Sequence, residues 1–539
     1  MTDPITLEVV RNRLEAIADE MESVILRSSH SAIVKEALDA SAALFDARGQ
    51  QIAQAAAAPI HLGSMIPGIE QLVAKHPPAT MQPGDVFVLN DPYEGGTHLP
   101  DVLMAVPVFA GGRIVGLAAV ITHHQDVGGS RPGSTPANAT EIFQEGLRIP
   151  LLKLYDAGVP NETLLAIIQR NVRIPDVVMG DLNGQLAACE IGRRGLATLV
   201  ERFGTDAFAE LLDRAERLTR EALARIPDGT YRFVDYLDDD GIRVGRQIRI
   251  EVAVTIAGDE LEIDLTGSDD QATGPINCVR ASTLAAIYYT VKVVTDPEIP
   301  ANAGCYRPVR LVLPERSVVN ASPPAPVNGR AVTVRRVVDA LLGAFAQAIP
   351  DRIPAASSGH PLVMSMGGVD PASGRAYVTA EVGTGGMGAR PGKDGIEAIQ
   401  TDTSNAQNVP VEALELEYPL RVGYYRLRPD SGGRGRWRGG LGTEKSLEVL
   451  RGELRVSHRG ERRLSSPWGL QGGEDGARAR TLLHRADGSE QELPSKLDFT
   501  MQPGDLLELW TSGGGGFGPP GERDPAAQAE DIAGGKVTR

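Results

Sequence analysis

Apolar residues at the start of the chain recur at intervals of three and four positions, from Ile5 to Ile25. An α-helix has 3.6 residues per turn, so this spacing puts them on one face and predicts a single amphipathic helix over residues 4–35. Asp3 stands directly before Pro4 and is placed to cap that helix.

Short apolar runs with the period of a β-strand follow. Residues 41–45 and 51–55 flank a turn that ends in Gly49, which predicts a small hairpin, and residues 83–92 read as a turn leading into a strand. The same two periods predict the later elements: a helix over 205–225, a β-meander over 229–267, two apolar helices near 279–294 and 331–348, and β-strands through 419–510. Residues 354–410 are rich in Gly, Ser and Asn and are expected to form ordered loops between short strands.

These elements predict the fold class α+β, in a multi-domain mixed α/β chain. The expected divisions are an N-terminal α/β region with a helical start and a metal-site hairpin (1–200), a central α+β region with the meander, apolar helices and Gly-rich loops (201–418), a β-rich C-terminal domain (419–518) and a tail or short docking helix (519–539).

Composition narrows the classes of partner. The chain has 539 residues, a formal net charge of −16 and only 4% aromatic residues, so an acidic surface without stacking platforms makes nucleic acid an unexpected partner. The start of the chain lacks the basic and apolar blocks of a signal peptide, and apolar runs long enough to span a bilayer are missing, so we expect no membrane association. Three widely spaced cysteines give no disulfide framework and favour a cytoplasmic protein.

The most informative segment is a second predicted hairpin around Gly111 and Gly112. If these two glycines form the turn, residues whose numbers add to 223 face each other, so Asp101 lies opposite Thr122 and diagonal to His123. His98 would join them at the open end of the hairpin. A slip of one residue would exchange the histidine that points toward Asp101, so His123 and His124 both remain candidates at this stage.

This grouping has the composition of a metal site. Neutral imidazoles with one or two carboxylates are the ligands of a catalytic Zn²⁺, Mn²⁺ or Fe²⁺. The alternative is that His98 and Asp101 are turn residues and that the histidines only bond loop carbonyls. His61 has no partner nearby in sequence and is interpreted as structural.

Two Gly-rich loops remain. Residues 383–392 could let backbone amides approach an anion or a partner chain, or could be a simple turn, whereas residues 513–518 are interpreted as a flexible surface turn. The chain contains neither a GxSxG nucleophile elbow nor a GxxxxGK[ST] phosphate loop, so we predict no serine nucleophile and no ATP site of that kind in it.

Taken together, several motifs identify a family. NDPYEGGTHLPD, HHQDVGG, GGMGARPGKDG, TSNAQNVPVEALELEYPLR, RPDSGGRGRWRGGLG and GGGGFGPP resemble, in this order along nearly the whole chain, the hydantoinase B / oxoprolinase family. That family includes B-type subunits of ATP-dependent N-methylhydantoinases and caprolactamase, part of 5-oxoprolinase, and related subunits of acetone and acetophenone carboxylases.

The resemblance implies a metal-bearing subunit that works with a separate A-type ATPase subunit of the actin-like kind. The A subunit would bind ATP and Mg²⁺ and phosphorylate the carbonyl oxygen of a cyclic amide, and metal-activated water would then attack the carbonyl carbon. Its metal ligands, for Zn²⁺ or Mn²⁺, fall here on Asp39, His98, Asp101 and His123. The segment around Asp39 lacks the basic and aromatic context frequent in the family, which leaves the substrate pocket undefined.

The residues next to these ligands are candidates for orienting them. His124 and Asp126 are expected to orient the metal-bound water, and Asp91 to support the ligand histidines.

The function predicted from the sequence is therefore the B subunit of an ATP-dependent hydrolase of cyclic amides, of the hydantoinase or 5-oxoprolinase type. We expect it to act on a small cyclic amide in a hetero-oligomer such as α2β2. Two alternatives stay open: a subunit of an ATP-dependent ketone carboxylase, and a non-catalytic scaffold for the ATPase subunit.

Overall fold

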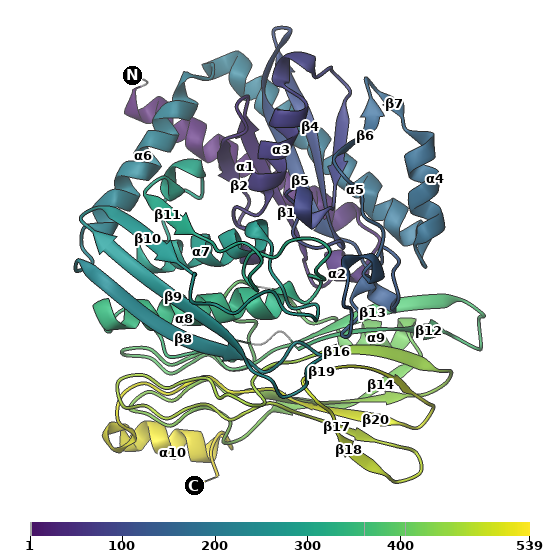
Figure 1. Cartoon of the computed structure of the whole chain (residues 1–539), viewed down its shortest axis with the longest axis vertical. Coiled ribbons are helices and arrows are strands. Elements are labelled where there is room, and N and C mark those ends of the chain that lie inside the picture. Colours follow the sequence, from purple (N-terminus) through teal and green to yellow (C-terminus); the bar gives the residue numbers. More distant parts are fainter. Residues whose placement is uncertain (1–2, 360–361, 405, 539) are drawn as a thin grey trace.

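The computed structural model describes residues 3–359, 362–404 and 406–538. Among these, the strands form four sheets, and the helices are distributed along the chain. The N-terminal sheet with its helices lies at one end of the molecule, the strands of the last third lie at the other end, and the central region lies between them (Figure 1). This mixed arrangement confirms the predicted α+β class.

The first helix, α1 (Pro4–Ser28), is amphipathic and capped as predicted. The Asp3 carboxylate accepts hydrogen bonds from the backbone amides of the first turn. The helix ends at Ser28, and a separate short helix, α2 (Ala32–Lys35), follows, so the prediction of one helix through residue 35 is wrong. Asp181 explains the break, because its carboxylate accepts from the amides of His30 and Ser31 at 2.7 and 3.1 Å and holds the chain in an extended turn.

The N-terminal sheet has seven strands in the order β2-β1-β5-β4-β3-β6-β7. Their bounds are β1 Ala40–Asp46, β2 Gln51–Gln54, β3 Val86–Leu89, β4 Asp101–Ala110, β5 Arg113–His123, β6 Leu152–Asp156 and β7 Val159–Pro160. Both expected hairpins, β1–β2 and β4–β5, are present. Helices α1 and α5 (Pro175–Phe203) pack on one face, and α3 (Met65–Lys75) packs on the other.

Helix α5 lies outside the predicted elements because glycines interrupt its apolar pattern. A Cβ at Gly192 would lie 2.4 Å from the sulfur of Met21, so glycine allows α1 and α5 to pack closely. The shorter α4 (Glu162–Asn171) precedes it, and neither it nor α3 was expected.

The central region follows the prediction. Helix α6 (Asp206–Leu223) leads into a four-stranded sheet of order β11-β10-β9-β8, formed by β8 Gly229–Leu237, β9 Ile248–Ala257, β10 Glu260–Asp264 and β11 Val309–Val312. The two apolar helices are α7 (Arg280–Val294) and α8 (Arg330–Ala348), and the second is buried along nearly its whole circumference.

The last third is rich in strands, as expected. One sheet has the order β13-β12-β16-β19 and contains β12 Leu362–Val369, β13 Ala376–Gly383, β16 Leu454–Arg459 and β19 Lys496–Met501. The other has the order β14-β15-β20-β17-β18 and contains β14 Leu420–Leu427, β15 Thr443–Val449, β17 Arg480–His484, β18 Glu490–Glu492 and β20 Leu506–Trp510. Because β12 pairs with β16, the first of these sheets joins segments on both sides of residue 418. The short α9 (Val411–Glu417) precedes β14, and α10 (Pro525–Ala533) lies near the C-terminus.

The glycine run at residues 513–518 is buried, so its interpretation as a flexible surface turn is wrong. A Cβ at Gly514 would lie 2.1 Å from the carbonyl oxygen of Met387, in the other Gly-rich loop. The two backbones touch directly, and the amide of Ala389 donates a hydrogen bond to the carbonyl of Gly515 at 2.9 Å. Glycine therefore serves here to pack extended segments against one another, not to keep them mobile.

Within the described ranges, the helices are too short or too polar to cross a lipid bilayer.

Candidate metal centre

The open end of the β4–β5 hairpin brings the predicted residues together. Next to the turn, Ala110 pairs with Arg113, in the predicted register. A bulge between Val108 and Phe109 then shifts the pairing by one residue, so Asp101 lies opposite His123 and not opposite Thr122 as we expected. The extra residue is on β5, and its effect is to bring His123 directly beside the carboxylate.

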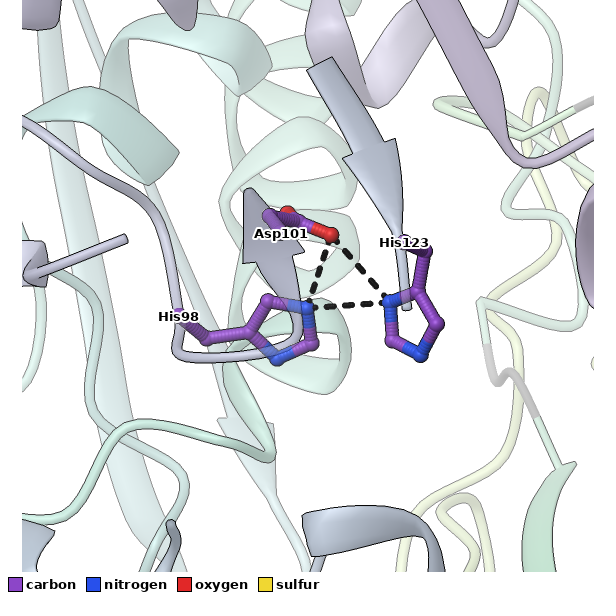
Figure 2. A group of neighbouring side chains, drawn as sticks. All are labelled: His98, Asp101 and His123. Carbon is purple, nitrogen blue, oxygen red and sulfur yellow. Dashed lines mark hydrogen bonds and ion pairs between the residues drawn. The ribbon is translucent and has the colours of Figure 1, made fainter. Parts of the chain in front are cut away.

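Three donor atoms form a compact triangle at this point (Figure 2). His98 Nε2 lies 3.0 Å from Asp101 Oδ1, His123 Nδ1 lies 3.1 Å from the same oxygen, and the two nitrogens are 3.2 Å apart. His98 belongs to the loop before β4, Asp101 begins β4 and His123 ends β5. The three side chains are buried or nearly so.

The triangle fits a transition-metal ion. A tetrahedral ion about 2.1 Å from each ligand atom requires those atoms to be about 3.4 Å apart, within a few tenths of an ångström of the three distances here. The donor set of two imidazoles and one carboxylate is the one that Zn²⁺ and Mn²⁺ accept.

Asp39, the fourth predicted ligand, lies beside the triangle at the start of β1. Its carboxylate oxygen Oδ2 is 3.9 Å from His123 Nδ1, and its backbone carbonyl accepts a hydrogen bond from the amide of His123 at 3.1 Å. The preceding residue, Leu38, has a positive φ of 60°, a conformation that is costly for a leucine and turns the chain into β1 at this point.

The electrostatics suit metal ligands. Burial lowers the pKa of His98 to about 3, so its ring is neutral and offers a lone pair. Burial opposes ionisation of Asp101, but the Arg330 guanidinium and a hydrogen bond to His123 outweigh it and hold the pKa of this carboxyl well below its ordinary value. The second oxygen of Asp101 is bound by Arg330 and by the Thr97 hydroxyl.

His98 is oriented from a distant part of the chain. Its other ring nitrogen, Nδ1, lies 3.3 Å from the backbone carbonyl of Asn328. A proton on Nδ1 would bond that carbonyl and leave the Nε2 lone pair directed at the triangle.

His61 was interpreted as a lone structural residue, but the structure places it against the same group. Its Nε2 is 3.7 Å from Asp39 Oδ1 and 3.9 Å from Asp101 Oδ2, and its Nδ1 is 3.2 Å from the Ser41 hydroxyl. The ring is fully buried, and burial lowers its pKa. The first hairpin could have indicated this position of His61. Strand β2 runs antiparallel to β1 and so returns the chain toward Asp39, shortly before the 3-10 turn Pro59–His61.

The three predicted supporting residues bond elsewhere. His124 Nε2 lies 2.9 Å from the side-chain oxygen of Gln185 on α5. Asp126 accepts from two backbone amides of the following loop and from Arg173, and Asp91 accepts from Arg148 and the Tyr93 amide. Each therefore fixes the backbone near the site through a contact that points away from the triangle.

A cavity of about 100 Å³ adjoins the triangle, with Asp39, His98 and His123 in its lining. Much of the remaining wall is apolar, and it includes Ile33, Ile60, Val332, Val363, Ala380 and Val382. The cavity thus combines side chains from the first 123 residues with residues of α8, β12 and β13.

A sequence model of the family described as hydantoinase B/oxoprolinase matches residues 3–520. The chain belongs to this family. Among its relatives is the caprolactamase subunit beta of Pseudomonas jessenii, which is 35% identical over 99% of this chain and 94% of the relative.

Solved structures agree with the assignment. The ATP-dependent caprolactamase of Pseudomonas jessenii superposes with a TM-score of 0.93 at 33% identity, over all of this chain and 95% of that one. An acetone carboxylase superposes with a TM-score of 0.91 at 22% identity, over 99% of this chain and 78% of that one, a likeness that speaks for the fold alone.

Proposed function

We propose that the chain is the metal-bearing B subunit of an ATP-dependent hydrolase of cyclic amides. The observation that carries the proposal is the triangle of His98, Asp101 and His123 beside a largely apolar cavity, in a chain of this family. The apolar wall suits the carbon ring of a small lactam or hydantoin.

We propose Asp39, His98, Asp101 and His123 as the ligands of a Zn²⁺ or Mn²⁺ ion. When bound, such an ion supplies a Lewis acid that lets water act as a nucleophile near neutral pH. Burial keeps His98 neutral, Arg330 keeps Asp101 ionised, and the Asn328 carbonyl orients the His98 ring.

His124 and Asp126 are proposed as positioning residues. His124 anchors the end of β5 to α5, and Asp126 closes the following loop, so together they fix the backbone that carries His123.

The amide must be activated before water attacks, because amide resonance protects an unstrained ring. The chain lacks a phosphate loop of the GxxxxGK[ST] type, so we assign ATP and Mg²⁺ to a partner A-type subunit that phosphorylates the carbonyl oxygen. The two subunits would form a hetero-oligomer such as α2β2. A cytoplasmic location remains our prediction and agrees with three buried free cysteines.

The deciding experiment is co-expression with an A-type subunit, followed by measurement of ATP hydrolysis with hydantoins, lactams and ketones, with and without bicarbonate. We expect cyclic amides to stimulate ATP hydrolysis and to be opened. Stimulation only by ketones with bicarbonate would favour the carboxylase alternative instead.

Metal content tests the ligand assignment. The purified chain should hold about one transition-metal ion, and a His98→Ala variant should lose it, whereas His484→Ala, at the remote end of β17, should keep it. A metal-free complex with full activity would refute the catalytic metal and return the chain to the scaffold alternative.

A further inference from the structure

Three arginines enter the cavity beside the metal centre. Arg330, Arg335 and Arg459 line it and are at most 6% exposed. Placing a guanidinium among apolar side chains is costly unless an anion compensates it. Only Arg330 has such a partner, Asp101, because within the described parts of the chain no carboxylate oxygen lies within 4.0 Å of Arg335 or Arg459.

Neutral groups hold the two uncompensated arginines in place. Arg335 donates to the Gln400 side chain at 3.2 Å and to the Thr401 carbonyl at 3.4 Å. Its Nη1 is buried and has no hydrogen-bond partner among the described residues. Arg459 donates to the backbone and side-chain oxygens of Asn328 at 2.9 and 2.8 Å, and its Nε is likewise buried and unpartnered. Each guanidinium is thus oriented and keeps a spare donor.

Both arginines remain charged beside the cavity. Burial lowers the pKa of each arginine to about 10, which leaves both cationic near pH 7. Burial raises the pKa of Glu145, near Arg459, to about 8, so this acid is mostly uncharged near pH 7. Among the described residues, three arginines but only one carboxylate, Asp39, line the cavity, and Asp101 pairs with Arg330, so the lining carries an excess of positive charge.

The backbone adds to that charge. Helix α8 has 19 residues and begins at Arg330, and its first residues, Ala331 and Val332, line the same cavity. The amides at a helix N-terminus carry a partial positive charge and favour an anion.

We propose that Arg335 and Arg459, together with the N-terminus of α8, form an oxyanion subsite that binds an anionic group of the substrate next to the metal centre. This inference rests on the proposed function and deepens it. Guanidinium groups match the tetrahedral oxygens of a phosphoryl group and the planar oxygens of a carboxylate. The phosphoryl group on the activated carbonyl oxygen is the occupant that every substrate of the proposed reaction shares, whereas a carboxylate belongs only to substrates such as 5-oxoproline.

Direct binding is the first test. The metal-loaded chain in complex with its A subunit is titrated with inorganic phosphate by calorimetry, for the wild type, R335M, R459M and the double variant. R428M is the matched control, because Arg428 is also held by carbonyl oxygens but follows β14 and lies outside the cavity. We expect each cavity variant to weaken phosphate binding at least tenfold, R335K to recover part of it, and R428M to have no effect.

Stability separates this role from a structural one. Methionine in place of an uncompensated buried arginine should leave the unfolding midpoint unchanged or raise it. A structural arginine would give the opposite result, with a lowered midpoint and unaffected phosphate binding, and that outcome would overturn the proposal. Phosphate binding that depends only on the metal, lost in H98A but unchanged in R335M, would overturn it as well.

Turnover identifies the source of the oxyanion. If the subsite holds the phosphoryl group, R335M slows hydrolysis of neutral lactams and of 5-oxoproline alike, whereas a carboxylate site affects only 5-oxoproline. A complex that opens no cyclic amide but still binds phosphate through Arg335 and Arg459 would refute the proposed function and leave the subsite standing. Normal turnover and normal phosphate binding in the double variant would refute the subsite and leave the proposed function standing.

Discussion

Asp101 pairs with Arg330 and is also a proposed metal ligand, and substitutions at these two residues test both roles. Its carboxylate is 1% exposed, faces His98 and His123 with one oxygen, and accepts from Arg330 and Thr97 with the other. Asp101→Asn keeps the shape of the side chain and removes its charge. The variant should lose the metal, because a neutral amide replaces an anionic ligand.

The same change leaves Arg330 as an unpaired cation that is only 3% exposed. Removing one partner of a buried ion pair costs about 3–5 kcal/mol. We therefore expect metal-stripped D101N to unfold at a clearly lower urea concentration than metal-stripped wild type. Since both proteins lack the ion in this comparison, the difference reports the loss of the carboxylate's own contacts, of which the ion pair with Arg330 is the charged one.

A second substitution completes the argument. D101N/R330M removes both charges and should recover about 0.5–3 kcal/mol relative to the sum of the single variants, without recovering the metal. Elemental analysis of the four proteins gives the metal content, and urea unfolding gives the free energy of unfolding. If D101N unfolds at the wild-type urea concentration, Arg330 does not depend on Asp101, and if it keeps a full complement of metal, Asp101 is not a ligand.

Three further outcomes are expected. Gly514→Ala should destabilise the chain by about 1–3 kcal/mol in urea unfolding, because the added Cβ would lie 2.1 Å from a backbone carbonyl oxygen. In the control, Gly521→Ala, the added Cβ has no atom of a described residue within 4 Å, so stability should not change. Burial raises the pKa of Glu145 from 4.5 to about 8, so between these pH values the folded chain holds a proton that the unfolded chain releases. The melting temperature of the wild type should therefore fall, relative to that of E145Q, as the pH rises from 4.5 to 8. The same pH dependence of the melting temperature in both proteins would contradict this. Burial also raises the pKa of the thiols, so a thiol reagent should label the native chain negligibly and the denatured chain at three sites: Cys189, Cys278 and Cys305.

The hairpin that carries the proposed metal centre could be predicted from the sequence because its strands have the period of a β-strand and its turn has two glycines. The register of β5 could not be predicted in full. One bulged residue near the turn shifts the pairing of every later residue, and the sequence has no residue preference that marks the bulge. Asp39 came only from the resemblance to the family. Spacing along the chain does not show that β1 pairs with β5 and so brings this carboxylate to His123.

Other features depend on contacts between distant segments. His61 looked isolated because its neighbours Asp39 and Asp101 stand far from it in sequence. Arg335 lies on a helix whose apolar pattern was recognised, but nothing in that pattern shows that the helix is buried on nearly all sides, arginines included. The glycines at 513–518 could equally mark a mobile loop or a tight contact, and only the approach of a second backbone distinguishes the two.

The order in which the cavity's walls occur along the chain has a consequence for biosynthesis. The four proposed metal ligands all lie within the first 123 residues, whereas the opposite wall comes from α8, β12 and β13, and Arg459 comes from β16. A nascent chain therefore carries its metal ligands long before it can enclose a substrate. Asn328 and Arg330, which orient His98 and pair with Asp101, are made only later, and the cavity is complete only when β16 pairs with β12.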